Sequence, residues 1–342
     1  MHSRVLIFHY KIIRVSQYFS IQDQVALFFS YFIILHQIME EKRCAVVTGG
    51  NKGIGFEICR QLALNNIQVI LTARNESRGI EAVNKLNGLG LPIPNVIFHQ
   101  LDIQDPTSMP HLVQFIKTHF KKLDILVNNA AISGLRFVAE KIVYNAQGEA
   151  LLEQLVDENG DILPGVSEQT YEMVEECLKT NYYGTKRVTE ALVPLLQLSK
   201  SPRIVNITSI SGLLSHIPND KFKEELDDID NLTEERIDEM IQLFLRDSKA
   251  DKLRENGWPL APASAYTVSK VFLNAYTRLM AKKFQNKILV NCVHPGLVKT
   301  DMSLNSGVHV SEGAKGPVMA ALLPDDGPSG VYFDQTQIAS FK

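Results

Sequence analysis

Tyr266 and Lys270 lie four residues apart in the segment AYTVSK, so in a helix both side chains leave the same face and approach each other. A free phenol has a pKa of about 10, and a nearby ammonium stabilises the phenolate and lowers that pKa. The pair could therefore act as an acid–base group near neutral pH. A tyrosine packed on the core beside a solvated lysine would leave the same pattern, so other residues have to decide between the two.

A glycine-rich stretch, TGGNKGIG (Thr48–Gly55), follows a short apolar run and precedes a segment with helical spacing. Gly49, Gly53 and Gly55 permit a tight turn and let the backbone approach a pyrophosphate at a helix N-terminus. A purely structural turn would also use glycines. The position between a predicted strand and a predicted helix favours nucleotide binding.

The end of the second predicted strand indicates which nucleotide binds. An NAD site carries Asp or Glu there, whereas this chain has Arg74, and a guanidinium suits the 2′-phosphate of NADP(H). Lys52 in the glycine turn adds a second positive charge. The less favoured alternative is that Arg74 is only a solvated charge at a strand end. Asp102, which ends the third predicted strand, could accept a hydrogen bond from the adenine amino group or could only form a turn.

Short apolar runs alternate with helical patterns from Met39 onward. We expect strands at Cys44–Gly50, Gln68–Arg74, Asn95–Asp102, Leu123–Ala130, Arg203–Ser209, Lys287–Val293 and Gly330–Phe333. We expect helices at Gly53–Leu64, Ser77–Leu86, Met109–Phe120, Glu168–Leu198 and Tyr266–Phe284. Buried strands that alternate with helices predict an α/β fold, a doubly wound parallel sheet of the Rossmann type, in a single domain over residues 39–342.

Two segments interrupt this alternation, residues 132–167 and residues 212–264. Both follow the carboxyl end of a predicted strand, where doubly wound sheets bind ligands, so we expect lid-like insertions. The second contains NLTEERIDEMIQLFLRD, an amphipathic helix in which Asn231 and Glu234 resemble a capping box. This helix would cover either the substrate or a surface that related proteins use for pairing.

The composition excludes several classes of function. A formal net charge of −3 gives no reason to expect a nucleic acid or an acidic membrane as partner. The four cysteines form no C-x-x-C pair, which argues against a zinc site or a disulfide framework and fits a reducing compartment. We therefore expect a cytoplasmic protein without a metal.

An apolar extension, residues 1–38, precedes the predicted domain. Its longer apolar run, VALFFSYFIILHQI, is shorter than the roughly 18–20 residues of a membrane-spanning helix and lacks a signal-peptide cleavage pattern. It is either a weak membrane anchor or a segment added by an upstream start codon, with Met39 as the working start. The second interpretation is favoured, because the first strand begins a few residues after Met39.

Taken in order, these motifs resemble the short-chain dehydrogenase/reductase family of the Tyr-x-x-x-Lys type over most of the chain. The long segment between Ser209 and Tyr266 resembles that of the monomeric carbonyl-reductase branch. Several short sequence segments are similar to those of plant enzymes of the salutaridine-reductase and menthone/neomenthol-reductase type. Ala131 departs from the glycine that the family usually has. The matching motifs are Thr48–Gly55, NNAA (Asn128–Ala131), Asn181 in KTNYYGT, Ser209 in NITSIS, the Tyr266/Lys270 pair and HPGLVKT (His294–Thr300).

The resemblance implies a catalytic tetrad of Asn181, Ser209, Tyr266 and Lys270. Tyr266 would protonate the substrate oxygen that Ser209 holds, while Lys270 binds the nicotinamide ribose and Asn181 holds a water that resupplies the proton. Hydroxyl chemistry alone would not separate Ser209 from its neighbours Thr208 and Ser211. The implied cofactor-binding residues are Gly49, Asn51, Lys52, Gly53, Ile54, Gly55, Arg74, Asp102, Asn129, Tyr266, Lys270, Pro295, Gly296, Val298 and Thr300.

The resulting hypothesis is an NADPH-dependent reductase that converts a ketone on a hydrophobic, cyclic terpenoid or alkaloid into a secondary alcohol. We expect a monomer with a small-molecule substrate and no membrane partner. Met302, Phe244 and Trp258 would line the pocket, although core packing explains them equally well. The alternatives are a membrane-attached steroid or lipid carbonyl reductase and a non-catalytic NADPH-binding regulator.

Overall fold

Parallel strands and helices alternate through the computed structural model, which describes residues 42–89, 95–155, 163, 165–260 and 262–342. The apolar extension and the proposed start at Met39 lie outside the described residues. Within those ranges, no helix has the length and apolar character needed to cross a membrane. Residues Arg43–Lys342 form one compact unit.

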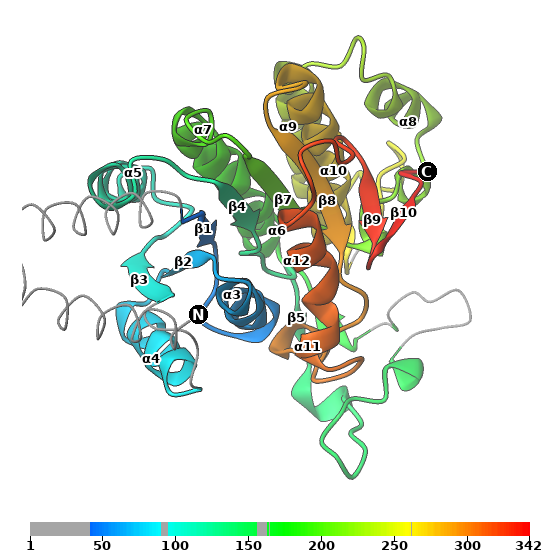
Figure 1. Ribbon diagram of the computed structural model, residues 1–342. Helices are drawn as coiled ribbons and strands as arrows, with labels where there is room; N and C mark the ends of the chain where they lie inside the picture. Colours follow the sequence, from blue (N-terminus) through cyan, green and yellow to red (C-terminus); the bar gives the residue numbers. More distant parts are fainter. Residues whose placement is uncertain (1–41, 90–94, 156–162, 164, 261) are drawn as a thin grey trace, which may run out of the picture. The chain divides into compact units, whose positions relative to one another are not determined.

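Eight strands of the described chain form one sheet in the order β10-β9-β8-β7-β4-β1-β2-β3 (Figure 1). Neighbouring strands pair in parallel, except that β10 runs antiparallel to β9. The strand order reverses at β1, which confirms the predicted doubly wound sheet. The strands are β1 (Cys44–Val47), β2 (Gln68–Ala73), β3 (Val96–Gln100), β4 (Ile125–Asn128), β7 (Arg203–Ile207), β8 (Leu289–His294), β9 (Tyr332–Asp334) and β10 (Gln337–Ala339).

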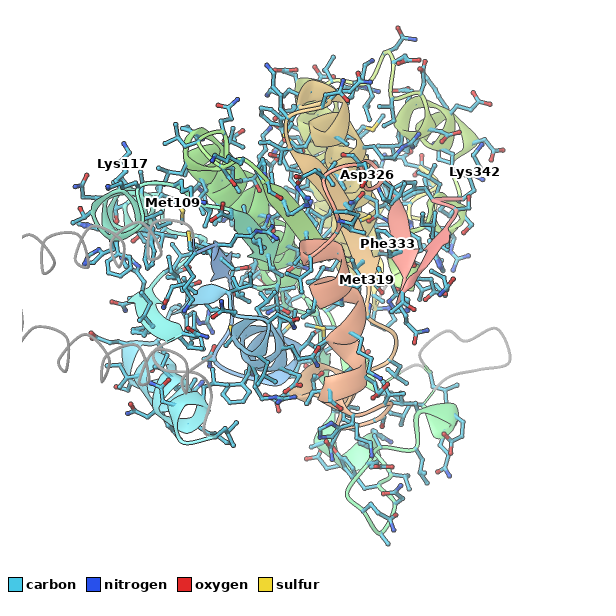
Figure 2. All side chains as sticks on the ribbon, in the orientation of Figure 1. Met109, Lys117, Met319, Asp326, Phe333 and Lys342 are labelled. Atoms are coloured by element: carbon cyan, nitrogen blue, oxygen red, sulfur yellow. The ribbon has the colours of Figure 1, made fainter. Side chains whose placement is uncertain are left out.

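Helices cover both faces of the sheet and enclose two hydrophobic cores. Figure 2 labels Met109 of α5, which belongs to one core, and Met319 of α12, which packs against the other. The first core also holds α7, α9 and α10, and the second holds α3 and α4. The helices are α3 (Gly53–Leu64), α4 (Glu76–Asn87), α5 (Ser108–His119), α6 (Tyr171–Leu178), α7 (Thr185–Leu196), α8 (Asp220–Asp227), α9 (Glu234–Lys249), α10 (Ser264–Lys283), α11 (Val310–Gly313) and α12 (Lys315–Ala321).

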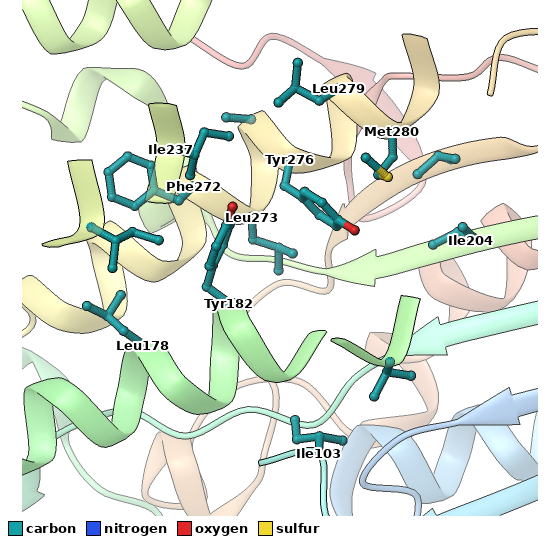
Figure 3. Packing of buried hydrophobic residues seen from close by; sticks show 14 of the residues in the cluster. Ile103, Leu178, Tyr182, Ile204, Ile237, Phe272, Leu273, Tyr276, Leu279 and Met280 are labelled. Carbon is teal, nitrogen blue, oxygen red and sulfur yellow. The ribbon is translucent and has the colours of Figure 1, made fainter. Parts of the chain in front are cut away.

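Three aromatic side chains pack α10 against the π-helical turn η3 (Lys179–Gly184). Tyr182 packs edge-on against Tyr276 and Phe272 of α10, at centroid distances of 6.0 and 6.5 Å. Figure 3 shows these three side chains close together in the buried cluster. Such T-shaped contacts are favourable beyond the area they bury. Because α10 also carries Tyr266 and Lys270, this packing helps to hold the candidate catalytic pair in position.

Most predicted elements are present, and two differ. The helix predicted at Glu168–Leu198 begins only at Tyr171, where the Thr170 side chain accepts a hydrogen bond from the Met173 N–H. It is then interrupted by η3 (Lys179–Gly184), a π-helical turn between α6 and α7. The last predicted strand begins two residues later than expected and ends one residue later, as β9, and it continues into a hairpin with the unpredicted β10. A short pairing of three residues on each side leaves little hydrophobic pattern to detect.

The two insertions have different structures. Residues 132–167 contain little regular structure: a two-residue antiparallel pairing of β5 (Arg136–Phe137) with β6 (Ser167–Glu168) and the short helices η1 (Ala139–Lys141) and η2 (Leu152–Gln154). Residues 212–264 contain η5 (Leu214–His216), α8 and α9.

The start of α9 corrects the predicted capping box. The helix is capped by Thr233, whose hydroxyl accepts a hydrogen bond from the Arg236 N–H at 3.1 Å. Asn231 instead turns back and donates to Asp228 at 2.8 Å. Thr233 precedes two acidic residues, which interact favourably with the N-terminus of the helix dipole, so both signals place the start after Thr233.

Phe244 and Trp258 are core residues and do not line a substrate pocket, which corrects that expectation. Phe244 is fully buried, and its ring lies 5.3 Å from that of Trp258. Trp258 stacks on Phe222 of α8 and donates its indole N–H to Asp247 at 2.8 Å. The apolar face of α9 therefore anchors the second insertion to the domain.

Phe244→Ala should lower the free energy of unfolding by about 3–5 kcal/mol, because it leaves a cavity in a fully packed region. The substrate KM of the folded fraction should stay unchanged. Urea unfolding followed through Trp258, the chain's only tryptophan, measures the first quantity. Met302→Ala is the matched comparison, because Met302 is exposed. We expect it to alter KM and leave stability intact, and a changed KM in Phe244→Ala would contradict this assignment.

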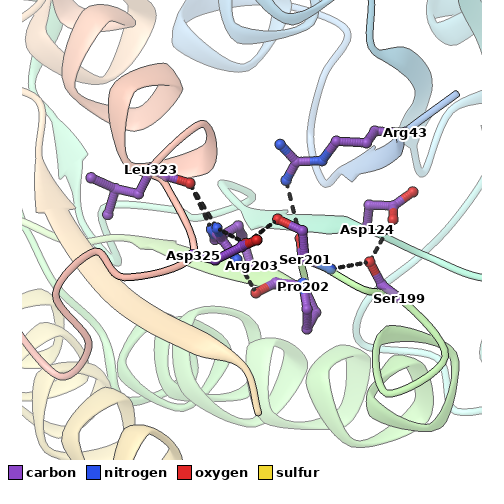
Figure 4. A network of polar contacts seen from close by, with 8 residues as sticks. All are labelled: Arg43, Asp124, Ser199, Ser201, Pro202, Arg203, Leu323 and Asp325. Atoms are coloured by element: carbon purple, nitrogen blue, oxygen red, sulfur yellow. Dashed lines mark hydrogen bonds and ion pairs between the residues drawn. The ribbon is translucent and has the colours of Figure 1, made fainter. Parts of the chain in front are cut away.

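A polar network ties the amino ends of the strands together (Figure 4). The Arg203 guanidinium is buried, donates to the Leu323 carbonyl at 2.7 Å and pairs with Asp325 at 2.8 Å. Ser199 donates to Asp124, and the other Asp124 oxygen accepts from the Cys44 N–H at 2.8 Å. This edge of the sheet is therefore occupied by structural bonds, which leaves the carboxyl edge for ligands.

Candidate active site

The predicted site residues follow the carboxyl ends of six different strands. The glycine turn follows β1, Arg74 follows β2 and Asp102 follows β3. Asn129 follows β4, Ser209 follows β7, and Pro295 and Gly296 follow β8. Because these strands are parallel, all of these residues lie at the same edge of the sheet.

Tyr266, Ser209 and Lys270 come together at this edge. Tyr266 lies in the first turn of α10, and its phenol is hydrogen-bonded to the Ser209 hydroxyl. Lys270 is buried, its Nζ lies 5.6 Å from the centre of the Tyr266 ring, and it donates to the Ile207 carbonyl at 2.8 Å. The neighbouring Thr208 is buried, and its hydroxyl has no partner within the described part of the chain. Of the hydroxyls that the sequence offered here, Ser209 is the one bonded to the phenol.

The pKa of the phenol differs from the expectation. Burial raises the pKa of Tyr266 to about 12, and the hydrogen bond from Ser209 offsets only part of that rise. Burial also lowers the pKa of Lys270 to about 8. The ammonium is directed at a backbone carbonyl, so in this structure Lys270 does not lower the phenol pKa toward neutrality. The phenol is therefore a firmly protonated acid until a further positive charge arrives beside it.

Asn181 lies in the π-helical turn η3, a feature that often marks functional sites. Its side chain makes two bonds with the backbone of Ile132: Oδ1 accepts from the N–H and Nδ2 donates to the carbonyl, both at 2.9 Å. Nδ2 also donates to Ser269 at 3.0 Å. The side chain is buried and binds neither Tyr266 nor Lys270 directly among the described residues. Any link to Lys270 has to pass through another group.

The glycine turn is shaped by Asn129. The Thr48 hydroxyl accepts from the backbone N–H groups of Asn129 and Ala130 at 2.9 and 3.0 Å, and Asn129 Nδ2 donates to the Thr48 carbonyl at 2.9 Å. Gly49 has a φ of +63°, which favours glycine. A Cβ at Gly55 would lie 2.4 Å from Asn129 Nδ2. The turn therefore needs glycine for its own packing, and its place at the N-terminus of α3 suits a pyrophosphate.

Gly55→Ala should weaken binding of the nicotinamide cofactor at least tenfold, or about 1.4 kcal/mol, because Asn129 and the turn must shift to admit the methyl group. Fluorescence titration of the cofactor measures this loss. Gly88→Ala is the control: it lies at the end of α4 with a φ of −68°, and its Cβ would come no closer than 3.4 Å to a neighbour. Equal affinities of the two variants would exclude Gly55 from the phosphate-binding turn.

The remaining cofactor candidates occupy positions that suit contact with a ligand. Arg74 is exposed, and among the described residues nothing bonds its guanidinium. Lys52 forms an exposed ion pair with Asp301. Asp102 accepts from the Gln104 N–H at 2.9 Å, so it also forms a turn. Asn51 and Ile54 are half-buried in the glycine turn and at the start of α3.

The segment after β8 forms a short structured loop. Gly296 has a φ of +83°, Val298 is buried, and Thr300 forms a reciprocal capping box with Ser303. The Ser303 hydroxyl also donates to the Val298 carbonyl at 2.6 Å. A Cβ at Gly53 would lie 3.3 Å from Thr300, so the loop lies against the glycine turn.

Two contacts between the loop after β8 and the first insertion were not predicted. Lys299 of the loop forms an ion pair with Glu149 of the first insertion, and Ser306 donates to the Ala150 carbonyl at 2.6 Å. These residues are about 150 positions apart in the chain, so no local pattern could indicate them. Ser269 was also missed as a partner of Asn181, although its position directly before Lys270 was a usable signal.

Comparisons with known proteins agree with this geometry. A family model described as short chain dehydrogenase matches residues 43–219 and 256–309. The chain belongs to the short-chain dehydrogenase family. It is 50% identical to salutaridine reductase of Papaver bracteatum over 309 residues, which cover 87% of this chain and 96% of that protein. It is 49% identical to (+)-neomenthol dehydrogenase of Arabidopsis thaliana over 306 residues, 88% and 99% of the two chains.

A solved structure of a relative has the same fold. The structure of salutaridine reductase from Papaver somniferum superimposes with a TM-score of 0.78 at 49% identity, covering 86% of this chain and 99% of that one. This short-chain dehydrogenase is therefore an oxidoreductase that acts on alcohol or carbonyl groups and uses a nicotinamide cofactor. The expected family, fold and enzyme class are confirmed.

Proposed function

We propose that this short-chain dehydrogenase uses NADPH to reduce a ketone on a hydrophobic, cyclic small molecule to a secondary alcohol. The observation that carries the proposal is the Tyr266 phenol, hydrogen-bonded to Ser209 and placed beside a buried Lys270 at the ligand-binding edge of the sheet. A structural tyrosine would need neither a second hydroxyl nor a buried cation at this position.

The reaction adds a hydride to the carbonyl carbon and a proton to its oxygen. NADPH, when bound, supplies the hydride. Ser209 holds the carbonyl oxygen and stabilises the negative charge that develops on it. Tyr266 gives its proton to that oxygen, and Lys270 passes on a proton from solvent that restores the phenol. Holding the carbonyl carbon close to the cofactor contributes much of the rate.

The preference for NADPH is proposed from the charges around the glycine turn. Arg74 is an exposed cation at the end of β2 without a protein partner among the described residues. Lys52 has only the exposed Asp301 as a partner, and an exposed ion pair is worth little, so a doubly charged phosphate can replace it. Both side chains suit the 2′-phosphate that separates NADPH from NADH.

The proposed substrate class is supported by exposed apolar side chains in the segments that carry or flank the predicted site residues. Ile210 follows Ser209 directly, Leu260 precedes α10, and Leu297, Met302 and Val308 belong to the loop after β8. Exposed apolar side chains in the segments that carry or flank the catalytic residues suit a hydrophobic ligand. The names of the relatives, salutaridine reductase and neomenthol dehydrogenase, support a cyclic terpenoid or alkaloid ketone.

A substrate screen tests this proposal. Purified protein is mixed with NADPH and a panel of monocyclic monoterpenoid ketones, polycyclic alkaloid ketones and short acyclic ketones, and the fall in NADPH absorbance is followed. We expect turnover with at least one cyclic class and much lower kcat/KM with acyclic ketones. Product analysis should find the secondary alcohol. Absence of turnover across the panel, with bound NADPH, would contradict the proposed reaction.

We also propose a cytoplasmic monomer. The second insertion packs α9 against α6 and α10 through the buried Ile237, Ile241 and Phe244, so this helix covers surfaces of the domain itself. A net charge of −3 offers no attraction to acidic membranes. Light scattering of the purified protein and fractionation of cells that express the full chain test the two statements separately.

A further inference from the structure

A hydroxyl next to the catalytic pair connects the two halves of the site. Ser269 is fully buried in α10, one residue before Lys270. It donates to the Tyr266 carbonyl at 2.7 Å and accepts a hydrogen bond from Asn181 Nδ2 at 3.0 Å. Among the described residues, this is the bond that joins the Asn181 side chain to the helix carrying Tyr266 and Lys270.

The Asn181 amide has no adequate replacement for this bond. One N–H of Nδ2 is satisfied by the Ile132 carbonyl at 2.9 Å, and Oδ1 by the Ile132 N–H. The other N–H has Ser269 and, at 3.3 Å, the thiol of Cys177, which is a weak acceptor. Loss of the Ser269 hydroxyl would leave a buried donor poorly satisfied, which is unfavourable. The amide would then shift, and the π-helical turn that carries it would shift as well.

We infer that Ser269 is a positioning residue, which holds Asn181 and its π-helical turn in register with Tyr266 and Lys270 so that the proton can be resupplied to the phenol. The inference rests on the proposed reductase function. Ser269 does not contact substrate or cofactor and acts only through Asn181 and the Tyr266 backbone. Its loss should therefore lower kcat and leave cofactor binding nearly unchanged.

The same helix provides a matched control in Thr277, two turns further on. Thr277 is also fully buried, donates to the Leu273 carbonyl at 2.7 Å and accepts from Asn206 Nδ2 at 2.8 Å. The hydrogen bonds of Ser269 and Thr277 thus have the same arrangement, with a backbone carbonyl on the same helix and an asparagine amide on another element. Only the asparagine bonded to Ser269 belongs to the proposed tetrad.

The experiment compares Ser269→Ala with Thr277→Val. Both should lower the unfolding midpoint. We expect Ser269→Ala to lower kcat roughly 10- to 100-fold with the KM for NADPH within about twofold of the original, because small displacements at a catalytic site are costly. Thr277→Val should keep its kcat. Ser269→Cys, which keeps a weakly bonding group, should fall between Ser269→Ala and the original and carries the test if the alanine variant does not fold.

A double-mutant cycle separates positioning from general damage. Ser269→Ala should lower kcat in the original protein and cause little additional loss in an Asn181→Ala background, whereas Thr277→Val should leave kcat unchanged in both backgrounds. Equal kcat values for Ser269→Ala and Thr277→Val, or an undiminished effect of Ser269→Ala in the Asn181→Ala background, would overturn the inference while the reductase function stands.

Hydrogen exchange of the backbone amides in Lys179–Gly184 tests the same inference without turnover. Ser269→Ala should speed exchange in this turn, and Thr277→Val should not. If the original protein reduces no ketone in the panel, the proposed function has failed, and this exchange comparison still decides whether Ser269 holds the turn. Unchanged exchange in Ser269→Ala would contradict it.

Discussion

Tyr266→Phe will lower kcat for ketone reduction by on the order of 10³-fold, because it removes the single proton that the phenol gives to the carbonyl oxygen. The ring and its packing remain, so binding of NADPH should change less than twofold. Stopped-flow absorbance measures the first quantity and fluorescence titration the second. A large loss of kcat with little change in NADPH binding is the result expected if Tyr266 is the general acid.

The comparison variant for this experiment is Tyr182→Phe. Tyr182 is buried near the site, and its hydroxyl has no partner among the described residues. Removing that hydroxyl should leave kcat unchanged and should not destabilise the fold. If Tyr266→Phe lost rate and NADPH binding in equal proportion, Tyr266 would be a structural residue, and the proposed mechanism would be wrong.

Arg74→Asp should reverse the preference between the two nicotinamide cofactors. It removes the cation proposed to hold the 2′-phosphate and places a carboxylate where it can bind the ribose hydroxyls of NADH. We expect kcat/KM for NADPH to fall about 100-fold, which corresponds to roughly 2.8 kcal/mol, and that for NADH to stay equal or rise. Steady-state rates with each cofactor at fixed ketone concentration give both values.

Lys117→Asp controls for the change in net charge. Lys117 is exposed on α5, so the substitution alters the charge of the protein by the same amount without touching the end of β2. The effect of Arg74→Asp on NADPH should also weaken at high salt, because the interaction is ionic. An unchanged cofactor preference in Arg74→Asp would remove this residue from the site.

Local patterns were sufficient to predict the sheet and the residues that its strands position. The run CAVV before the glycine turn is fully buried in β1, and QVILTA is β2, because continuous apolar runs between helices form parallel strands. The order of the motifs then placed Asn129, Ser209 and Tyr266 at one edge. Their roles came from the resemblance, and the hydrogen bond between Ser209 and the phenol is consistent with them.

Features that depend on contacts between distant segments could not be predicted. Helical spacing predicted α9, but the same spacing fits a lid or a core helix, and only its packing on Trp258 separates the two. The raised pKa of Tyr266 reflects burial, which residue types alone do not give. The π-helical turn at Asn181 is fixed by bonds to Ile132 and Ser269, which lie 49 and 88 positions away.

The titration of Tyr266 tests the central claim most directly. Protein labelled with ¹³C-tyrosine is titrated free and in complex with NADP⁺, and Tyr266→Phe identifies the signal. In the free protein the pKa of the phenol is about 12. The positive nicotinamide ring brings the further charge that favours the phenolate, so in the complex we predict ionisation below about pH 9. A phenol that stays protonated in the complex up to about pH 11 would contradict the proposed role of Tyr266.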